Sequence, residues 1–185
     1  GLVTPDVVCH SNKRLCVRVN SQDTIPALVD VCITTETQIG TRALWRSNRL
    51  RKLFLTFAEP GQVGLSSIGS LLSPTTREGD NGLAIDIDPT AKTFKKLMAP
   101  IAPGLFEPVT ITNYRPISIN QKYMMDSSAG TLAYDGEREV TLSTGDRIEI
   151  TLDRRGPRTI DVAKTIENIA YSGFLISDDT LQSSR

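Results

Sequence analysis

The run LFLTF at residues 53–57 leads directly into AEPGQVGLSSIG at residues 58–69. The first part is short and continuously apolar, which indicates a β-strand. Residues 62–72 then carry apolar side chains at helical spacing, and Ser73-Pro74 ends that helix. The stretch therefore predicts a strand, a Gly-rich turn and a helix. Backbone N–H groups left unpaired at such a helix start can hold a phosphate.

The composition is that of an ordinary globular chain. Of 185 residues, 39% are hydrophobic and 23% are charged, so we expect one β-rich domain over residues 1–176 and a flexible polar tail over 177–185. The formal net charge of +0 argues against a nucleic-acid partner. No apolar run approaches the roughly 20 residues of a membrane span, so we expect no membrane partner.

The cysteines and the single histidine offer no metal site. Cys9, Cys16 and Cys32 are odd in number and follow no secretory signal, which favours a reduced, cytoplasmic setting. Their spacing lacks the paired CxxC pattern of zinc sites, so small buried thiols are expected. His10 has no evident partner in the sequence and is expected at the surface.

The rest of the chain predicts a mainly β fold with two helices. Apolar β-branched runs indicate strands at 7–9, 15–19, 29–33 and 83–87, and a hairpin turn at 11–13 joins the first two. Asp135-Gly136 and Gly145-Asp146 are turn signals within an expected meander over 131–152. Residues 100–104, with two prolines, are expected to form a fixed loop outside any strand ladder. Residues 161–172 have helical periodicity and precede Gly173, so we expect a helix packed on the sheet.

Two further features left alternatives open. The basic cluster of Arg46, Arg49, Arg51 and Lys52 is either a solvated turn or the neighbour of a phosphate. Trp45, the sole tryptophan, is expected to be a core or interface anchor.

Several blocks together resemble the C-terminal domain of the ATP–NAD kinase superfamily, and they are most similar to its acetoin-catabolism X branch. The blocks occur in the same order and spacing along the chain: Ile39–Trp45, Ala58–Ser66, Ala99–Leu105, Asp135–Glu139 and Gly156–Arg158.

The resemblance implies a β-sandwich-like domain that works with a separate N-terminal α/β domain. In the family that N-terminal domain carries a Gly-Gly-Asp-Gly motif with the catalytic aspartate, and the nucleotide lies between the two domains. This chain has no such motif, so we expect it to be the C-terminal domain alone and inactive by itself. For the complete protein the resemblance implies phosphoryl transfer from ATP or polyphosphate to NAD or a related hydroxyl substrate, a divalent metal, and a homo-oligomer.

The resemblance also implies which residues face the nucleotide, although it assigns none of them a catalytic or metal-binding role. They are Glu59, Pro60, Gly61, Gln62, Gly64, Leu65, Ala102, Gly104, Asp135 and Gly136.

Two departures from the family pattern leave the substrate open. Val63-Gly64-Leu65 stands in place of a Thr-Ala-Tyr segment, and Gly104 stands in place of a histidine. Glu59 is either a contact to a ribose hydroxyl or metal-bound water, or an ordinary carboxylate at a strand end. Asp135-Gly136 is either part of the site or a tight turn without a ligand. The alternative for the whole chain is a β-rich assembly module with no chemistry of its own.

Overall fold

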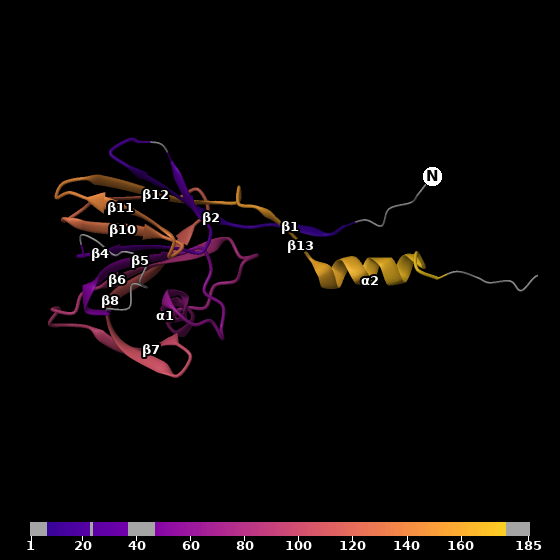
Figure 1. Ribbon diagram of the computed structural model, residues 1–185, viewed down its shortest axis with the longest axis horizontal. Helices are drawn as coiled ribbons and strands as arrows, with labels where there is room; N and C mark the ends of the chain where they lie inside the picture. The colour runs from indigo at the N-terminus through magenta and orange to yellow at the C-terminus, as the bar shows by residue number, and fades with distance from the viewer. Residues whose placement is uncertain (1–6, 23, 37–46, 177–185) are drawn as a thin grey trace, which may run out of the picture. The chain divides into compact units, whose positions relative to one another are not determined.

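The computed structural model describes residues 7–22, 24–36 and 47–176, and in these ranges the chain is mainly β with two α-helices (Figure 1). The predicted fold class is therefore confirmed. By compactness the chain divides into two units, Asn12–Gly156 and a smaller one drawn from both ends of the chain. The expectation of a single domain over residues 1–176 stays a prediction. Trp45, the block at 39–45, Arg46 and the tail at 177–185 lie outside the described residues.

The larger unit contains two antiparallel sheets. The seven-stranded sheet has the order β11 (Arg138–Leu142), β10 (Gly130–Tyr134), β4 (Asp30–Thr34), β5 (Leu50–Leu55), β6 (Asn81–Ile87), β8 (Leu105–Ser118) and β7 (Lys95–Ala102). The four-stranded sheet has the order β3 (Ile25–Ala27), β2 (Arg14–Val19), β12 (Arg147–Asp153) and β9 (Lys122–Asp126). A short 3₁₀ helix, η1 (Ser47–Arg49), precedes β5.

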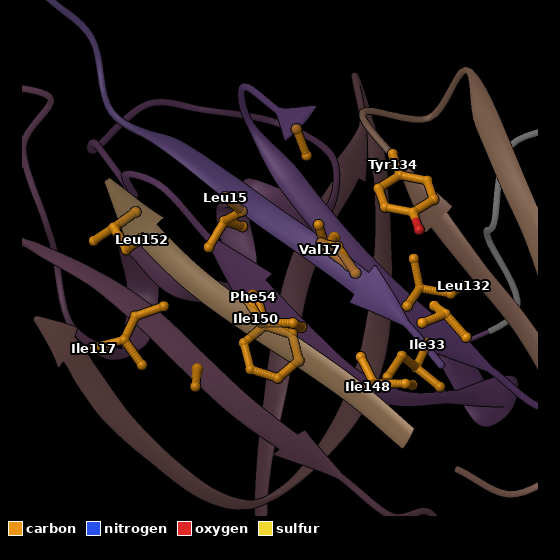
Figure 2. Close-up of a cluster of buried hydrophobic side chains, with 14 of the residues drawn as sticks. Leu15, Val17, Ile33, Phe54, Ile117, Leu132, Tyr134, Ile148, Ile150 and Leu152 are labelled. Atoms are coloured by element: carbon orange, nitrogen blue, oxygen red, sulfur yellow. The ribbon is translucent and has the colours of Figure 1, made fainter. Parts of the chain in front are cut away.

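The two sheets pack face to face around an apolar core. Alternating residues of β2 and β12, such as Val17 and Ile150, meet Phe54 of β5 and Leu132 of β10. Figure 2 shows these side chains directed into the space between the strands. β12 alternates buried and more exposed residues, which fixes its register, because a shift by one residue would turn its buried row outward.

The helix α1 (Leu65–Leu72) covers the other face of the larger sheet. Leu53 and Leu55 lie on that face and form a second core with Ile68 of α1 and Ala99 of β7. Helix and sheet approach closely at Gly69, where an added Cβ would lie 2.2 Å from Leu55 Cδ1. Figure 1 shows β7 next to α1, so the β7–β8 hairpin curls around the helix. The predicted strand–turn–helix unit is thereby confirmed.

The smaller unit pairs β1 (Cys9–Ser11) with β13 (Arg158–Ile160) and continues into α2 (Val162–Ser172). Asp161 caps this helix by accepting a hydrogen bond from Lys164 N, 2.9 Å. Gly173 ends it with a left-handed φ of 66°, as predicted for a helix stop. None of the α2 side chains is buried.

Three local expectations were wrong. The turn at 11–13 does not form a hairpin, because β1 pairs with β13 rather than with β2. The meander over 131–152 breaks after β11, because β12 joins the other sheet. Residues 100–102 belong to strand β7, with Pro100 opposite Phe106. The sheet tolerates Pro100 because β7 is an edge strand, which does not need every N–H for its ladder.

Candidate functional site

The Gly-rich turn leaves β5 and enters α1 through two glycines in the left-handed region. Gly61 has φ 85°, and Gly64 has φ 87° with ψ −157°, a conformation that is essentially restricted to glycine. Gly64 is the N-cap of α1 and supplies no side-chain hydrogen bond to it. The first turn of the helix thus begins without a side-chain cap, as the sequence predicts for a phosphate-holding turn.

The structure brings two of the predicted blocks into contact. Gly64 N donates a hydrogen bond to Pro100 O of β7, 3.0 Å. The tip of the β7–β8 hairpin therefore lies beside the Gly-rich turn, although the two are far apart in the sequence. Gly61 and Gly104 are both exposed, and a Cβ added to either would meet nothing within 4 Å. Open space thus adjoins the backbone of both loops.

The other predicted residues of this pair of loops have different environments. Glu59 N donates a hydrogen bond to Gln62 Oε1, 3.2 Å. Pro60 is exposed, Ala102 is half-buried, and Leu65 is buried in the core beneath α1. Leu65 therefore serves packing, which leaves the backbone as the principal surface that the turn presents.

The carboxylate of Glu59 holds the loop that follows α1. It accepts a hydrogen bond from Arg77 N, 3.1 Å, and forms an ion pair with Arg77 Nε, 3.4 Å. The Arg77 guanidinium lies 3.6 Å from the ring centroid of Phe57, so the side chain is fixed on two sides. This arrangement supports the reading of Glu59 as a structural carboxylate at the strand end.

A buried lysine near this loop was not anticipated. Lys13 is 2% exposed, and its Nζ donates to Thr76 O, 2.7 Å, and Asn81 O, 2.5 Å. Burial, together with the nearby positive charge of Arg154, lowers the pKa of Lys13 to about 8. No local sequence signal marks this residue, because both carbonyl partners are more than 60 positions away.

Asp135 and Gly136 form a tight turn at the same end of the sheet. Both have positive φ, 52° and 68°, and Glu137 N closes the turn on Tyr134 O, 3.0 Å. The predicted turn is confirmed. The register places Tyr134 opposite Val31, and Asp30 opposite Leu55 at the end of β5. The turn and the Gly-rich segment thus follow the ends of β10 and β5, which lie at the same edge of the sheet with β4 between them.

The Asp135 carboxylate forms hydrogen bonds with the backbone of the preceding loop and β4. It accepts hydrogen bonds from the N–H groups of Leu28, Val29 and Asp30, at 2.8–3.2 Å. Its negative charge, after the larger effect of burial, raises the pKa of Asp30 to about 7. These contacts support the alternative in which the turn needs no ligand.

A second ionic cluster stabilises β2 and β12. Asp153 is 4% exposed and binds Arg14 Nε, 2.9 Å, and Arg155 Nε, 2.8 Å. Burial alone would raise the pKa of Asp153, but these arginines hold it well below its usual range. Cys16 donates to the same carboxylate, and burial raises the pKa of its thiol.

The predicted placement of the thiols and the histidine is largely confirmed. Cys16 and Cys32 are buried and Cys9 is half-buried, all as free thiols. His10 is partly exposed but has a partner that the sequence did not suggest, Asp161 Oδ2 at 2.7 Å from Nε2. Within the described ranges, no three His, Cys, Asp or Glu side chains gather closely enough to hold a metal ion. The residues of this part of the chain therefore do not fit a metal site.

Comparison with known proteins gives a consistent family assignment. The family model described as acetoin catabolism protein X C-terminal domain matches residues 13–155. The chain is 36% identical over 167 residues to acetoin catabolism protein X of Cupriavidus necator. That alignment covers 88% of this chain and 46% of the relative, so the chain spans about half the relative's length. Neither of the described helices is long and apolar enough to cross a membrane.

Proposed function

Since the chain belongs to the family of acetoin catabolism protein X C-terminal domains, we propose that it forms one wall of a nucleotide-binding cleft. In this proposal the opposite wall, with the catalytic aspartate, comes from an N-terminal α/β domain of the complete protein. The complete protein transfers a phosphoryl group from ATP or polyphosphate to NAD or a related hydroxyl substrate in the cytoplasm. Membership of the wider ATP–NAD kinase superfamily is part of the proposal.

The observation that carries the proposal is the contact between the two Gly-containing loops. Gly64 N donates to Pro100 O, and Gly61 and Gly104 are exposed glycines within four residues of that contact. Both have positive φ and lack neighbours where a side chain would be. A backbone without side chains lets a phosphate or ribose approach the N–H groups directly, and the uncapped start of α1 favours an anion there.

The residues of the wall act by binding and positioning. Phosphoryl transfer depends mainly on placing the phosphate and neutralising its charge, and in this proposal the other domain supplies the metal. Arg77 is paired with Glu59, and Lys13 is buried and bound to two carbonyls, so the wall offers backbone N–H groups rather than free positive charge. The contacts of Lys13 and Glu59 to the 76–81 segment keep that loop fixed beside the Gly-rich turn.

Calorimetry with NAD, NADP and ATP tests the proposal, using two matched glycine variants. Gly61 (φ 85°) and Gly145 (φ 89°) have the same backbone conformation and the same open surroundings. Gly61→Ala places a methyl group where the nucleotide approaches, so we expect at least a tenfold loss of affinity, while Gly145→Ala binds like the wild type. Equal affinities for all three proteins would refute the nucleotide wall. Formation of NADP by the chain itself would show that the second domain is not required.

A second function, assembly of identical chains, is favoured by one specific observation. The outer face of the β7–β8 hairpin exposes Met98 (52%) and Phe106 (58%), close to Leu105 (46%). Clustered apolar side chains of this size mark interaction surfaces more often than isolated ones. We propose that this face joins copies in a homo-oligomer, which is compatible with the nucleotide wall.

Sedimentation velocity tests the assembly surface with two methionines of equal exposure. Met98→Lys introduces a charge on the hairpin face, whereas Met124→Lys does so on β9 of the other sheet, where Met124 is 54% exposed. We expect an oligomer for the wild type and Met124→Lys, and a monomer for Met98→Lys. An oligomer that survives Met98→Lys would contradict this surface. An oligomer without any nucleotide binding would favour the assembly module alone.

A further inference from the structure

A polar cavity lies between the two sheets, at the end of the sandwich where β5 begins. Its volume is about 560 Å³, which is within the range of small-molecule sites. It is lined by the ends of β4, β6 and β9, the start of β5, Thr112 of β8 and the 127–129 segment. All of these belong to the larger unit.

The cavity begins where the apolar core of the sandwich stops. Phe54 packs edge-on against Tyr123 of the opposite sheet, with ring centroids 5.1 Å apart. Two residues earlier on the same face, β5 carries Lys52, and its cross-strand neighbour on β6 is Asp86. These two side chains form an ion pair and are each about one-third exposed. A charged pair cannot continue the dry core, so the sheets enclose a solvated space instead.

The charges of the lining are nearly balanced. Among the described residues of the lining, two cationic side chains, Arg51 and Lys52, stand against three carboxylates, Asp86, Asp88 and Asp126. Arg51 Nη1 is already bound to the carbonyls of Asn48 and Leu50, at 3.1 and 2.8 Å. The Lys52 ammonium is neutralised by Asp86. This balance disfavours a phosphate or another polyanion, which needs a surplus of donors and positive charge.

The lining offers donors and acceptors side by side. The Lys52–Asp86 pair presents an ammonium next to a carboxylate, and Thr90 and Thr112, whose hydroxyls donate to Asp88 and to Asp86 O, also line the cavity. The hydroxyl of Thr35 is buried and has no hydrogen-bond partner among the described residues. Ile33 and Met125 add apolar surface. Such a mixture suits a ligand whose every polar group both donates and accepts, and whose C–H faces are apolar.

We infer that this cavity binds a small, uncharged, hydroxyl-rich molecule, a monosaccharide or a cyclic polyol. Its hydroxyls donate to the carboxylate of Asp86 and accept from the ammonium of Lys52. The site is separate from the proposed nucleotide wall, because Lys52 lies near the start of β5 and Ala58 lies three residues past its end, roughly 20 Å apart along an extended chain. The inference can therefore be tested independently of the nucleotide proposal.

Titration of the ¹⁵N-labelled 185-residue chain, followed by amide NMR, tests the inference. The probes are D-glucose and myo-inositol, each up to about 100 mM, with inorganic phosphate as the charged comparison. We expect saturable shifts with at least one polyol, confined to the amides near Thr35, Asp86, Thr112 and residues 126–129. Phosphate is expected to leave these amides unchanged.

Three variants locate the binding groups. Asp86→Asn and Lys52→Met each remove one charged partner, and we expect each to raise the dissociation constant about tenfold or more. Asp80→Asn breaks the Arg154–Asp80 ion pair, which lies outside the cavity, and should bind like the wild type. No saturable shift with either polyol would overturn the inference. It would also be overturned if both cavity variants bound the polyol as tightly as the wild type, or if phosphate shifted the same amides.

Discussion

The ionisation of Asp30 makes the stability of the fold depend on pH. Asp30 begins β4 and makes two hydrogen bonds with Asp135. Its backbone N–H donates to the Asp135 carboxylate, 3.2 Å, and its C=O accepts from the Asp135 N–H, 3.0 Å. Burial, and then the neighbouring Asp135 charge, raise the pKa of Asp30 from 3.8 to about 7. Replacing Asp30 by asparagine keeps the shape of the side chain but removes this charge.

The sign and size of the effect follow from this raised pKa. The folded chain binds the proton more tightly than the unfolded chain, so this stability is fully present below about pH 4. It is lost as the pH rises through 7. Three pKa units correspond to at most about 4 kcal/mol, and partial exposure of the side chain reduces this to about 2–4 kcal/mol. Asp30→Asn should therefore be more stable than the wild type by about 2–4 kcal/mol at pH 8, and nearly equal to it at pH 4.

Urea unfolding followed by circular dichroism, at intervals from pH 4 to pH 8, measures this difference. Taking the variant minus the wild type cancels the titration of groups that do not interact with Asp30. Asp126→Asn, an exposed aspartate on β9, is the control and should show no such trend. A difference between Asp30→Asn and wild type that stays constant over this range would refute the reasoning.

Three further changes have expected outcomes. Tyr134 is 1% exposed and its hydroxyl has no partner among the described residues, so Tyr134→Phe should raise the unfolding free energy by about 1 kcal/mol; a loss of similar size in urea unfolding would show a missed hydrogen bond. Gly69→Ala forces a Cβ against Leu55 and Ala58, so it should cost about 1–3 kcal/mol in the same assay; unchanged stability would mean that α1 packs less closely than described. Asp153→Asn removes the buried carboxylate that Arg14 and Arg155 bind and should cost about 1–3 kcal/mol by thermal unfolding; unchanged stability would contradict the role of this ion cluster.

Local features of the fold were predictable because their causes lie within a few residues. Asp135-Gly136 forms its turn since both residues accept positive φ, and Gly173 ends α2 for the same reason. The strand and helix around the Gly-rich turn follow from the spacing of apolar residues between Leu53 and Leu72.

The prolines led to wrong secondary-structure predictions, because a strand tolerates proline where one of its sides has no paired neighbour. Pro100 lies in β7, an edge strand, although the sequence suggested a loop there, and Pro26 likewise lies in an edge strand, β3. Pro108 and Pro116 are accommodated in β8 because each has a paired strand on one side only, β7 for Pro108 and β6 for Pro116. Edge positions are a property of the sheet order, which the local sequence does not contain.

Long-range pairing also hid the ionic contacts. Arg14 and Asp153 are 139 positions apart and meet only because β2 pairs with β12. Lys13 finds its two carbonyls in the segment between α1 and β6. The family resemblance implied that residues of the Gly-rich turn and of the 99–105 block face one nucleotide, but it did not predict the hydrogen bond between Gly64 N and Pro100 O. The polar cavity was not anticipated, since Arg51 and Lys52 suggested only a solvated turn or a phosphate neighbour.

The central claim is that the Gly-rich turn and the β7–β8 tip form one wall of a nucleotide site. The most direct test is an amide NMR titration of the chain with NAD, NADP and ATP, read at Gly61, Gly64 and Gly104. The account predicts saturable shifts of all three glycine amides with at least one nucleotide by about millimolar concentration, and no shift at Gly145. Unchanged glycine amides with every nucleotide at that concentration would contradict it.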